Sequence, residues 1–300
     1  MAALTLEHRM FSLKFRHLLA ILPCTILTAL PTTTARAVDG VIEINQTRAL
    51  AGGVTAGDTP GFPVTISAAG SYRLTGNLDV TGLPQPENIW AVEITSSDVD
   101  LDLNGFSIIG PTDCSGMPKV CSPVGSGEGV SAGGQRRVAV RNGRVRGFGH
   151  AGIRLGPQGV VEEVHVMDNS SFGVAVELSG RIVSNTIEEN GINGITCGQG
   201  SFISGNALHR NGNDGIGTTE SLISNNVVML NGGAGISDAR ASLVTGNTVL
   251  SNTGLGLNLG QASAYGNNSI DGNNGGNANP QVANGTQIAT NMCGGDTICP

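Results

Sequence analysis

Acid–base and cationic side chains between positions 144 and 210 recur at an interval of 21 residues. Three series share this interval: Arg144 and His165; Glu188 and His209; and Asp168, Glu189 and Arg210. An imidazole titrates near neutral pH, so His165 and His209 are candidate bases. A guanidinium can bind a carboxylate through two hydrogen bonds, which makes Arg146 and Arg210 candidate clamps. Together these groups could remove a proton beside a carboxylate that an arginine holds.

This set of residues favours a sugar acid as the ligand and leaves several roles open. A lyase or epimerase of uronic-acid glycans needs one cation and one base. Paired carboxylates, for which Glu188 is a candidate, could instead hydrolyse a glycosidic bond. In a protein that only binds, Arg144, Arg146, Asp168 and Glu189 would contact the glycan. The alternative is a solvated face of mixed charges with no ligand at all.

Asparagines repeat with the same period over the second half of the chain. Asn185, Asn206, Asn226 and Asn247 are separated by 21, 20 and 21 residues, and a second asparagine and a Gly-aliphatic pair follow each of them. This period, with short alternating aliphatic runs, predicts coils of three short strands stacked about 4.8 Å apart. Side-chain amides on successive coils would then hydrogen-bond in one column: Asn169, Asn190, Asn211, Asn231 and Asn252.

The same stacking predicts which side chains meet across coils. One inward column contains Val145, Val166, Ile187, Leu208, Val228 and Val249. Alternate residues of a strand point to opposite faces, so the neighbours of these aliphatic residues point outward. The acid–base residues should therefore form one contiguous patch across four coils.

Two stretches resemble coils of a known superfamily. Val99–Gly110 reads VDLDLNGFSIIG, and Val138–Gly147 reads VAVRNGRVRG. With the asparagine repeat, they are similar to the PbH1 repeats of bacterial secreted proteins in the pectate-lyase-like superfamily. The resemblance covers roughly residues 60–275 and implies an all-β, single-stranded, right-handed parallel β-helix of about nine or ten coils. It implies no single activity, because this superfamily includes lyases, hydrolases, epimerases, adhesins and metal-delivery proteins.

The predicted domain organisation follows from where the repeat begins, breaks and ends. Residues 64–275 are expected to form the β-helix, with caps at residues 38–63 and 276–300 that cover its open strand edges. Residues 111–134 break the period and are expected to form an exposed loop. Residues 1–37 have the features of a signal peptide.

Cysteine spacing predicts two local disulfides. Cys114 and Cys121 flank one short loop, and Cys293 and Cys299 flank another. In an oxidising compartment each pair reads as a disulfide, whereas no Cys-x-x-Cys spacing or nearby histidine supports zinc. Cys197 lies at an inward position and is expected to be a buried free thiol.

The N-terminal segment predicts export. A basic start precedes an apolar stretch at residues 18–30, and Ala35-Arg36-Ala37 matches a small-x-small cleavage site. Cleavage after Ala37 would release the protein to the periplasm or the extracellular space; a lipid anchor on Cys24 is the rival interpretation. The apolar stretch is too short for a stable membrane span.

The net charge of the protein limits the classes of molecule that it could bind. Without residues 1–37 the chain has 12 basic and 22 acidic residues, a net charge of about −10. Such a protein has no general affinity for nucleic acid or anionic membranes. Six arginines nevertheless gather within residues 136–154, which would attract an anionic polymer unless they pair with Glu162 and Glu163.

No cofactor is predicted with force. Asp98, Asp100 and Asp102 share one outward face and are weak candidates for calcium, although a carboxylate-rich strand edge explains them as well. The leading functional hypothesis is a monomeric β-helix that binds an acidic polysaccharide or serves as a surface scaffold. An acidic-glycan lyase, epimerase or hydrolase is the alternative, and a metal-delivery protein is the third.

Export gives the first testable prediction. N-terminal sequencing of protein collected from the periplasm or medium should start at Val38, because the signal peptide is removed after Ala37. Thiol titration of the native protein should find no reactive cysteine and, after unfolding, one. A lipid on Cys24, or three thiols in native protein, would contradict this prediction.

Overall fold

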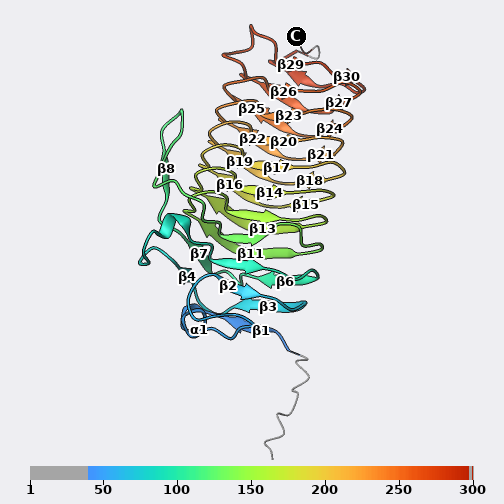
Figure 1. Ribbon diagram of the computed structural model, residues 1–300. Coiled ribbons are helices and arrows are strands. Elements are labelled where there is room, and N and C mark those ends of the chain that lie inside the picture. Colours follow the sequence, from blue (N-terminus) through green and yellow to red (C-terminus); the bar gives the residue numbers. More distant parts are fainter. Residues whose placement is uncertain (1–39, 297–298, 300) are drawn as a thin grey trace, which may run out of the picture. The chain divides into compact units, whose positions relative to one another are not determined.

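The computed structural model describes residues 40–296 and residue 299, which form a right-handed parallel β-helix (Figure 1). Each regular coil contributes one strand to a ten-stranded parallel sheet and two strand segments to a 19-stranded sheet. The ten strands agree with the nine or ten coils expected from the repeat. The predicted signal peptide lies outside the described residues. No helix of the described residues is long and apolar enough to cross a membrane.

The ten-stranded sheet consists of β2 (Val64–Ile66), β5 (Val92–Ile94), β10 (Val130–Ala132), β12 (Ile153–Leu155), β14 (Val174–Val176), β17 (Ile195–Cys197), β20 (Ile216–Thr218), β23 (Ile236–Asp238), β26 (Leu257–Asn258) and β29 (Val282–Ala283).

The larger sheet consists of β1 (Ile42–Ile44), β3 (Gly70–Leu74), β4 (Leu78–Asp79), β6 (Val99–Asp102), β7 (Ser107–Ile109), β11 (Ala139–Arg146), β13 (Val160–Met167), β15 (Arg181–Val183), β16 (Thr186–Glu188), β18 (Phe202–Ser204), β19 (Ala207–His209), β21 (Leu222–Ser224), β22 (Val227–Met229), β24 (Leu243–Thr245), β25 (Thr248–Leu250), β27 (Ala264–Gly266), β28 (Ser269–Asp271), β30 (Thr286–Gln287) and β31 (Met292–Cys293).

Aliphatic columns fill the interior, as the repeat predicts. Val166 pairs with Ile187, Ile187 with Leu208, and Leu208 with Val228, and all four side chains are fully buried. A matching column rises from the ten-stranded sheet: Ile195, Ile216, Ile236 and Leu257. Each coil therefore buries its aliphatic side chains against the coils above and below it, and together they form one continuous core along the stack.

Two asparagine ladders run along the stack. The predicted column is confirmed: the Nδ2 atom of Asn190 donates to Oδ1 of Asn211, and Asn211 in turn donates to Asn231, each at 3.0 Å. A second ladder runs through the turns inside the larger sheet: Asn185, Asn206, Asn226, Asn247, Asn268 and Asn291. The ladders satisfy buried turn amides and fix the register of successive coils.

A residue in the left-handed backbone conformation precedes each ladder asparagine except Asn291. In one column Ser184, Gly205 and Asn225 have φ values of 59°, 69° and 58°. In the other column Glu189 and Arg210 take the same conformation, with φ values of 57° and 54°. A left-handed residue other than glycine costs of order 1–3 kcal/mol, so the stacked asparagines next to it must hold the bend.

The parallel pairing extends beyond both expected ends of the β-helix. β1 already pairs with β3, and α1 (Gln46–Ala51) follows it, its first turn capped by Asn45. At the other end β29, β30 and β31 pair with β26, β27 and β28, past the expected end at residue 275. The reason is that Gln281 and Asn291 occupy ladder positions there.

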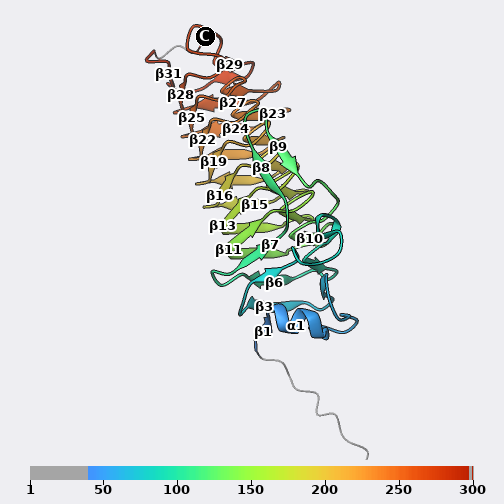
Figure 2. The ribbon, with the colours of Figure 1, turned by 90° about the vertical axis from the view of Figure 1, so that its left-hand side faces the viewer.

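The segment 111–134, expected to be an exposed loop, contains an antiparallel hairpin of β8 (Asp113–Ser115) and β9 (Val120–Ser122). The Cys114–Cys121 disulfide joins its strands, and the hairpin lies along the side of the coils (Figure 2). From Val130 the chain is back in the ten-stranded sheet as β10. A short 3₁₀ helix, Pro86–Asn88, precedes β5. Cys293 is bonded to Cys299, and Cys197 is free and buried, as predicted.

Removal of one ladder amide should weaken the stack. In Asn211→Ala the backbone N–H of Asn190 loses its acceptor, the Nδ2 atom of Asn190 keeps only backbone carbonyl acceptors, and Oδ1 of Asn231 keeps only the backbone N–H of residue 211 as a donor. We expect a loss of about 1–3 kcal/mol for each buried group left unsatisfied. Urea unfolding measures this, with Asn213→Ala as the control, because the Asn213 amide bonds only at the exposed surface. Equal effects of the two substitutions would show that the ladder does not stabilise the fold.

Candidate functional site

The structure brings the predicted acid–base residues together on the outer surface of β11, β13, β16 and β19. Arg144 lies beside His165 on the next coil, and Glu188 lies beside His209 on the coil after that. We call this surface the acid–base face, defined by Arg144, Arg146, His165, Asp168, Glu188, Glu189, His209 and Arg210. Its predicted register is confirmed.

Glu188 bridges the two histidines. Its Oε1 lies 2.6 Å from Nε2 of His165, and its Oε2 lies 3.0 Å from Nδ1 of His209. All three side chains are partly exposed. If His165 donates its Nε2 proton to Glu188, its Nδ1 atom has a free lone pair, and His209 lies against the same carboxylate through its own Nδ1. The arrangement therefore holds two imidazoles in fixed orientations, and either could accept a proton from a ligand.

Arg144 and Arg146 point outward from β11, and neither forms an ion pair with another described residue. Arg144 has only a long hydrogen bond, 3.5 Å from Nη1 to the carbonyl oxygen of Gly105. A cleft of about 390 Å³ lies beside Arg144 and His165. The guanidinium group of Arg144 at this cleft, with the exposed Arg146 two residues further along the strand, is available to an anionic ligand.

Other arginines of the cluster are neutralised, but by partners that the sequence did not identify. Arg137 pairs with Asp98 and Arg141 with Asp100, at 2.5 and 2.6 Å. Arg73 approaches Asp102 at 3.4 Å. The three aspartates expected as weak calcium ligands are thus held by arginines, and the described residues contain no group of three or more His, Cys, Asp or Glu that could hold a metal.

Glu162 and Glu163 do not neutralise the cluster as the alternative interpretation required. Glu162 forms its ion pair with Arg181, which lies further along the chain. The arginine cluster has a paired and an unpaired part. Arg137 and Arg141, at and before the start of β11, meet aspartates of the preceding coil. At the strand end the preceding coil offers only Ser107 and Ile109, beside Arg144 and Arg146.

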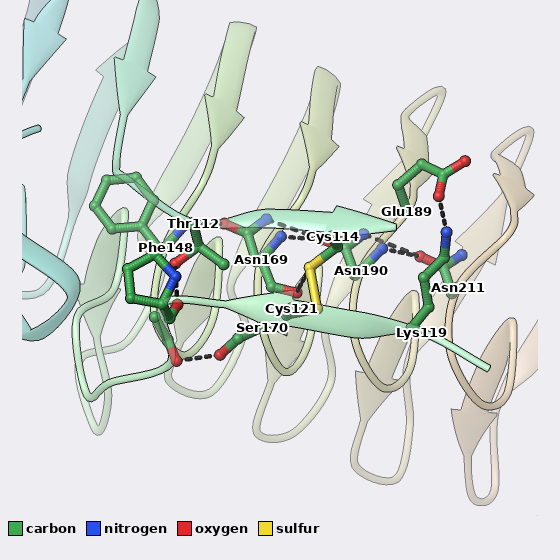
Figure 3. Close-up of a disulfide and its surroundings, with 12 residues drawn as sticks. Thr112, Cys114, Lys119, Cys121, Phe148, Asn169, Ser170, Glu189, Asn190 and Asn211 are labelled. Carbon is green, nitrogen blue, oxygen red and sulfur yellow. Dashed lines mark hydrogen bonds and ion pairs between the residues drawn. A yellow bond between two sulfur atoms is a disulfide. The ribbon is translucent and has the colours of Figure 1, made fainter. Parts of the chain in front are cut away.

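The hairpin of β8 and β9 adds a residue that the sequence did not single out. Lys119 forms an ion pair with Glu189, and its side chain is only 3% exposed (Figure 3). Burial lowers the pKa of Lys119, and the positive charge of Arg210 lowers it further. The insertion has no repeat partner, so periodicity could not place Lys119 over this coil.

A cleft of about 660 Å³ lies between the hairpin and the turns of the coils. Glu189 and Arg210 line its wall, and Arg210 Nη1 lies 3.9 Å from Glu189. Lys119 and Met117 come from the hairpin. The acid–base face is therefore bordered by two clefts, one beside Arg144 and one under the hairpin.

Asp168 is the carboxyl group of the acid–base face whose surroundings favour its neutral form. Burial raises the pKa of its carboxyl group, and the nearby carboxylate of Asp113 in β8 raises it further. A hydrogen bond from the Cys114 backbone N–H and the charges of Arg146 and Lys119 oppose the shift. A carboxyl group of this kind can keep its proton at a pH where an ordinary aspartate has lost it.

Comparison with known proteins supports the fold. No protein-family model matches the sequence, and no curated protein matches it. The Dettilon tailspike protein has a similar structure, with a TM-score of 0.54 and 16% identity, over 73% of this chain and 55% of the tailspike. A mutant of the periplasmic alginate epimerase AlgG has a TM-score of 0.51 and 13% identity, over 76% of this chain and 69% of the epimerase. At these identities the likeness establishes the right-handed parallel β-helix fold.

The raised pKa of Asp168 makes a prediction about stability. Between the unfolded pKa, about 3.9, and the higher folded pKa, the folded state binds more protons, so Asp168 destabilises the fold as pH rises. Asp168→Asn should therefore gain stability relative to wild type on going from acid to neutral pH. Thermal unfolding across this range measures the difference. A relative stability that is constant or falls with pH would contradict it.

Proposed function

We propose that this protein binds an anionic polysaccharide along the acid–base face, outside the cytoplasm. The observation that carries the proposal is the pair Arg144 and Arg146, which point outward from one strand with no ion-pair partner among the described residues. In an acidic protein, two such neighbouring cations, one of them at a cleft, are a focus for negative charge.

The spacing of the coils suits a polymer. Residues on successive coils are about 4.8 Å apart, so side chains on β11, β13, β16 and β19 can contact successive units of an extended chain. The hairpin over Glu189 and Arg210 would border that chain on one side. The structural neighbours include a tailspike and an alginate epimerase, and this likeness supports the proposal at the level of fold.

Export fits the same proposal. The Cys114–Cys121 and Cys293–Cys299 disulfides are typical of proteins that fold in an oxidising compartment. Cleavage after Ala37 would deliver the β-helix to the periplasm or beyond, where acidic polysaccharides are encountered.

Proton transfer is the second candidate, and the bridge from His165 through Glu188 to His209 favours it. An imidazole nitrogen would take the proton beside an arginine-bound carboxylate. Return of a proton to the opposite face gives epimerisation. In a lyase reaction the neighbouring glycosidic C–O bond breaks instead, a C=C bond forms in the ring, and the departing sugar hydroxyl takes up the proton that the imidazole removed. Hydrolysis has less support, because Glu188 is hydrogen-bonded to His165 and in contact with His209, and Glu189 is paired with Lys119.

Metal delivery, the third hypothesis, gains no specific support. Met167, Glu188, His209 and Met229 follow one another in one outward column. Glu188 separates the thioether of Met167 from the imidazole of His209, and its carboxylate is already occupied by two histidines.

The double substitution Arg144→Ala, Arg146→Ala tests the proposal. We expect the Kd for oligogalacturonate or oligoalginate to rise at least about tenfold, because the carboxylate clamps are removed. Stability should change little, since both side chains point away from the core. Calorimetric titration at fixed salt measures binding, and ultraviolet absorbance of the same mixtures reports any unsaturated lyase product.

The matched control is Arg181→Ala, Arg240→Ala, which removes two exposed cations from other coils. It should retain most of the affinity if position matters more than net charge. If the Arg144, Arg146 variant binds as wild type does, or if both variants lose affinity equally, the acid–base face is only a solvated surface.

A further inference from the structure

A second groove crosses the outer surface of the ten-stranded sheet, away from the acid–base face. It consists of two adjoining hollows of about 370 and 300 Å³ that share Arg154 and Glu177. The first extends to Trp90 and Glu93, and the second to Thr196. The groove therefore follows the stack from β5 to β17.

The floor of the groove is one outward column in continuous register. Glu93 pairs with Ser131, and Ser131 pairs with Arg154. Arg154 pairs with Ala175, which pairs with Thr196. Four steps of about 4.8 Å give a length of about 19 Å, enough for a short linear oligosaccharide. Small side chains at Ser131, Ala175 and Thr196 leave the floor open between the larger ones.

Trp90 provides an apolar surface at one end. It is the sole tryptophan of the chain, and it is 37% exposed. Its Nε1 atom donates a 2.9 Å hydrogen bond to the carbonyl oxygen of Ser126, which fixes the ring and satisfies its polar edge. A fixed, partly exposed indole can pack against the C–H face of a sugar ring at little entropic cost.

The charges of the groove are mainly negative. Glu93 has no ion pair with another described residue, and Glu177 accepts a hydrogen bond from the backbone N–H of Gly134 at 3.0 Å. The one cation, Arg154, is already drawn toward Glu128, whose Oε1 lies 3.5 Å from its Nη1. An acidic polymer would therefore be repelled, whereas sugar hydroxyl groups could donate to the free carboxylate oxygens.

A buried carboxylate, that of Glu128, lies next to Arg154. Its side chain is 3% exposed, its Oε1 also contacts Nδ1 of His150 at 3.0 Å, and its Oε2 is buried with no partner. A buried acceptor without a donor costs folding free energy. The carboxylate of Glu128 therefore destabilises the fold next to Arg154 and His150. The fold itself does not require a carboxylate at this position.

We propose that this groove binds a linear oligosaccharide that carries no carboxylate groups, with Trp90 as the stacking surface and Glu93 and Glu177 as acceptors for its hydroxyl groups. The proposal is independent of the anionic glycan on the acid–base face. It would allow one β-helix to hold an acidic and an uncharged glycan at once.

The single tryptophan makes the test direct. Intrinsic fluorescence of the wild-type protein is followed during titration with cellohexaose, maltohexaose and hexa-N-acetylchitohexaose, and with hexagalacturonate as the acidic comparison. We expect a saturable change with at least one uncharged hexasaccharide and none with hexagalacturonate. No change with any uncharged hexasaccharide, or a response to hexagalacturonate alone, would overturn the proposal.

Variants separate this groove from the acid–base face. Calorimetry should show that Trp90→Ala weakens binding of the responding hexasaccharide about tenfold, and that Trp90→Phe retains most of the affinity. Phe202→Ala is the matched control, since Phe202 is 39% exposed on β18, outside the groove. The Arg144, Arg146 double variant should keep the fluorescence response, so failure of one site does not imply failure of the other. If Phe202→Ala weakens binding as much as Trp90→Ala does, the groove is not the binding site.

Discussion

The hydrogen-bonded stacking of one coil on the next is the constraint on which the rest of the structure depends. Each coil turns through residues in a left-handed backbone conformation, such as Glu189 and Arg210. The asparagine that follows each of them bonds to the asparagines of neighbouring coils at about 3 Å. The ladders therefore offset the cost of the bends and, at the same time, forbid a shift of register between coils.

That constraint also creates the acid–base face. Because the register is fixed, residues 21 positions apart must be neighbours. Outward-pointing residues at this interval therefore lie side by side on the surface. Asp168, Glu189 and Arg210 occupy bend positions that any glycine or asparagine would fill with less strain. Their side chains instead meet the β8–β9 hairpin, where Glu189 pairs with Lys119 and Asp168 lies near Asp113. These three bends therefore carry backbone strain that glycine would avoid, and in return they place charged side chains beside the cleft under the hairpin.

Because the repeat is visible in the sequence, the sequence predicts the contacts between residues at equivalent positions of successive coils. The inward columns, the Asn190 ladder and the pairing of Glu188 with His209 follow from the interval alone. It could not predict features that depend on segments without a repeat partner. Lys119 comes from an insertion, the ion pairs of Arg137 and Arg141 join two coils that the same insertion separates in the sequence, and Trp90 follows a 3₁₀ turn. Only three-dimensional contacts place those residues beside the stack.

The most direct test of the account is a crystal structure of the protein with a bound oligogalacturonate. We expect sugar carboxylates at the guanidinium groups of Arg144 and Arg146, with successive sugars crossing β13, β16 and β19 beside the hairpin. His165 or His209 should then face the carbon next to a clamped carboxylate. An acidic glycan bound on the ten-stranded sheet instead, or one that leaves Arg144 and Arg146 in solvent, would contradict the account.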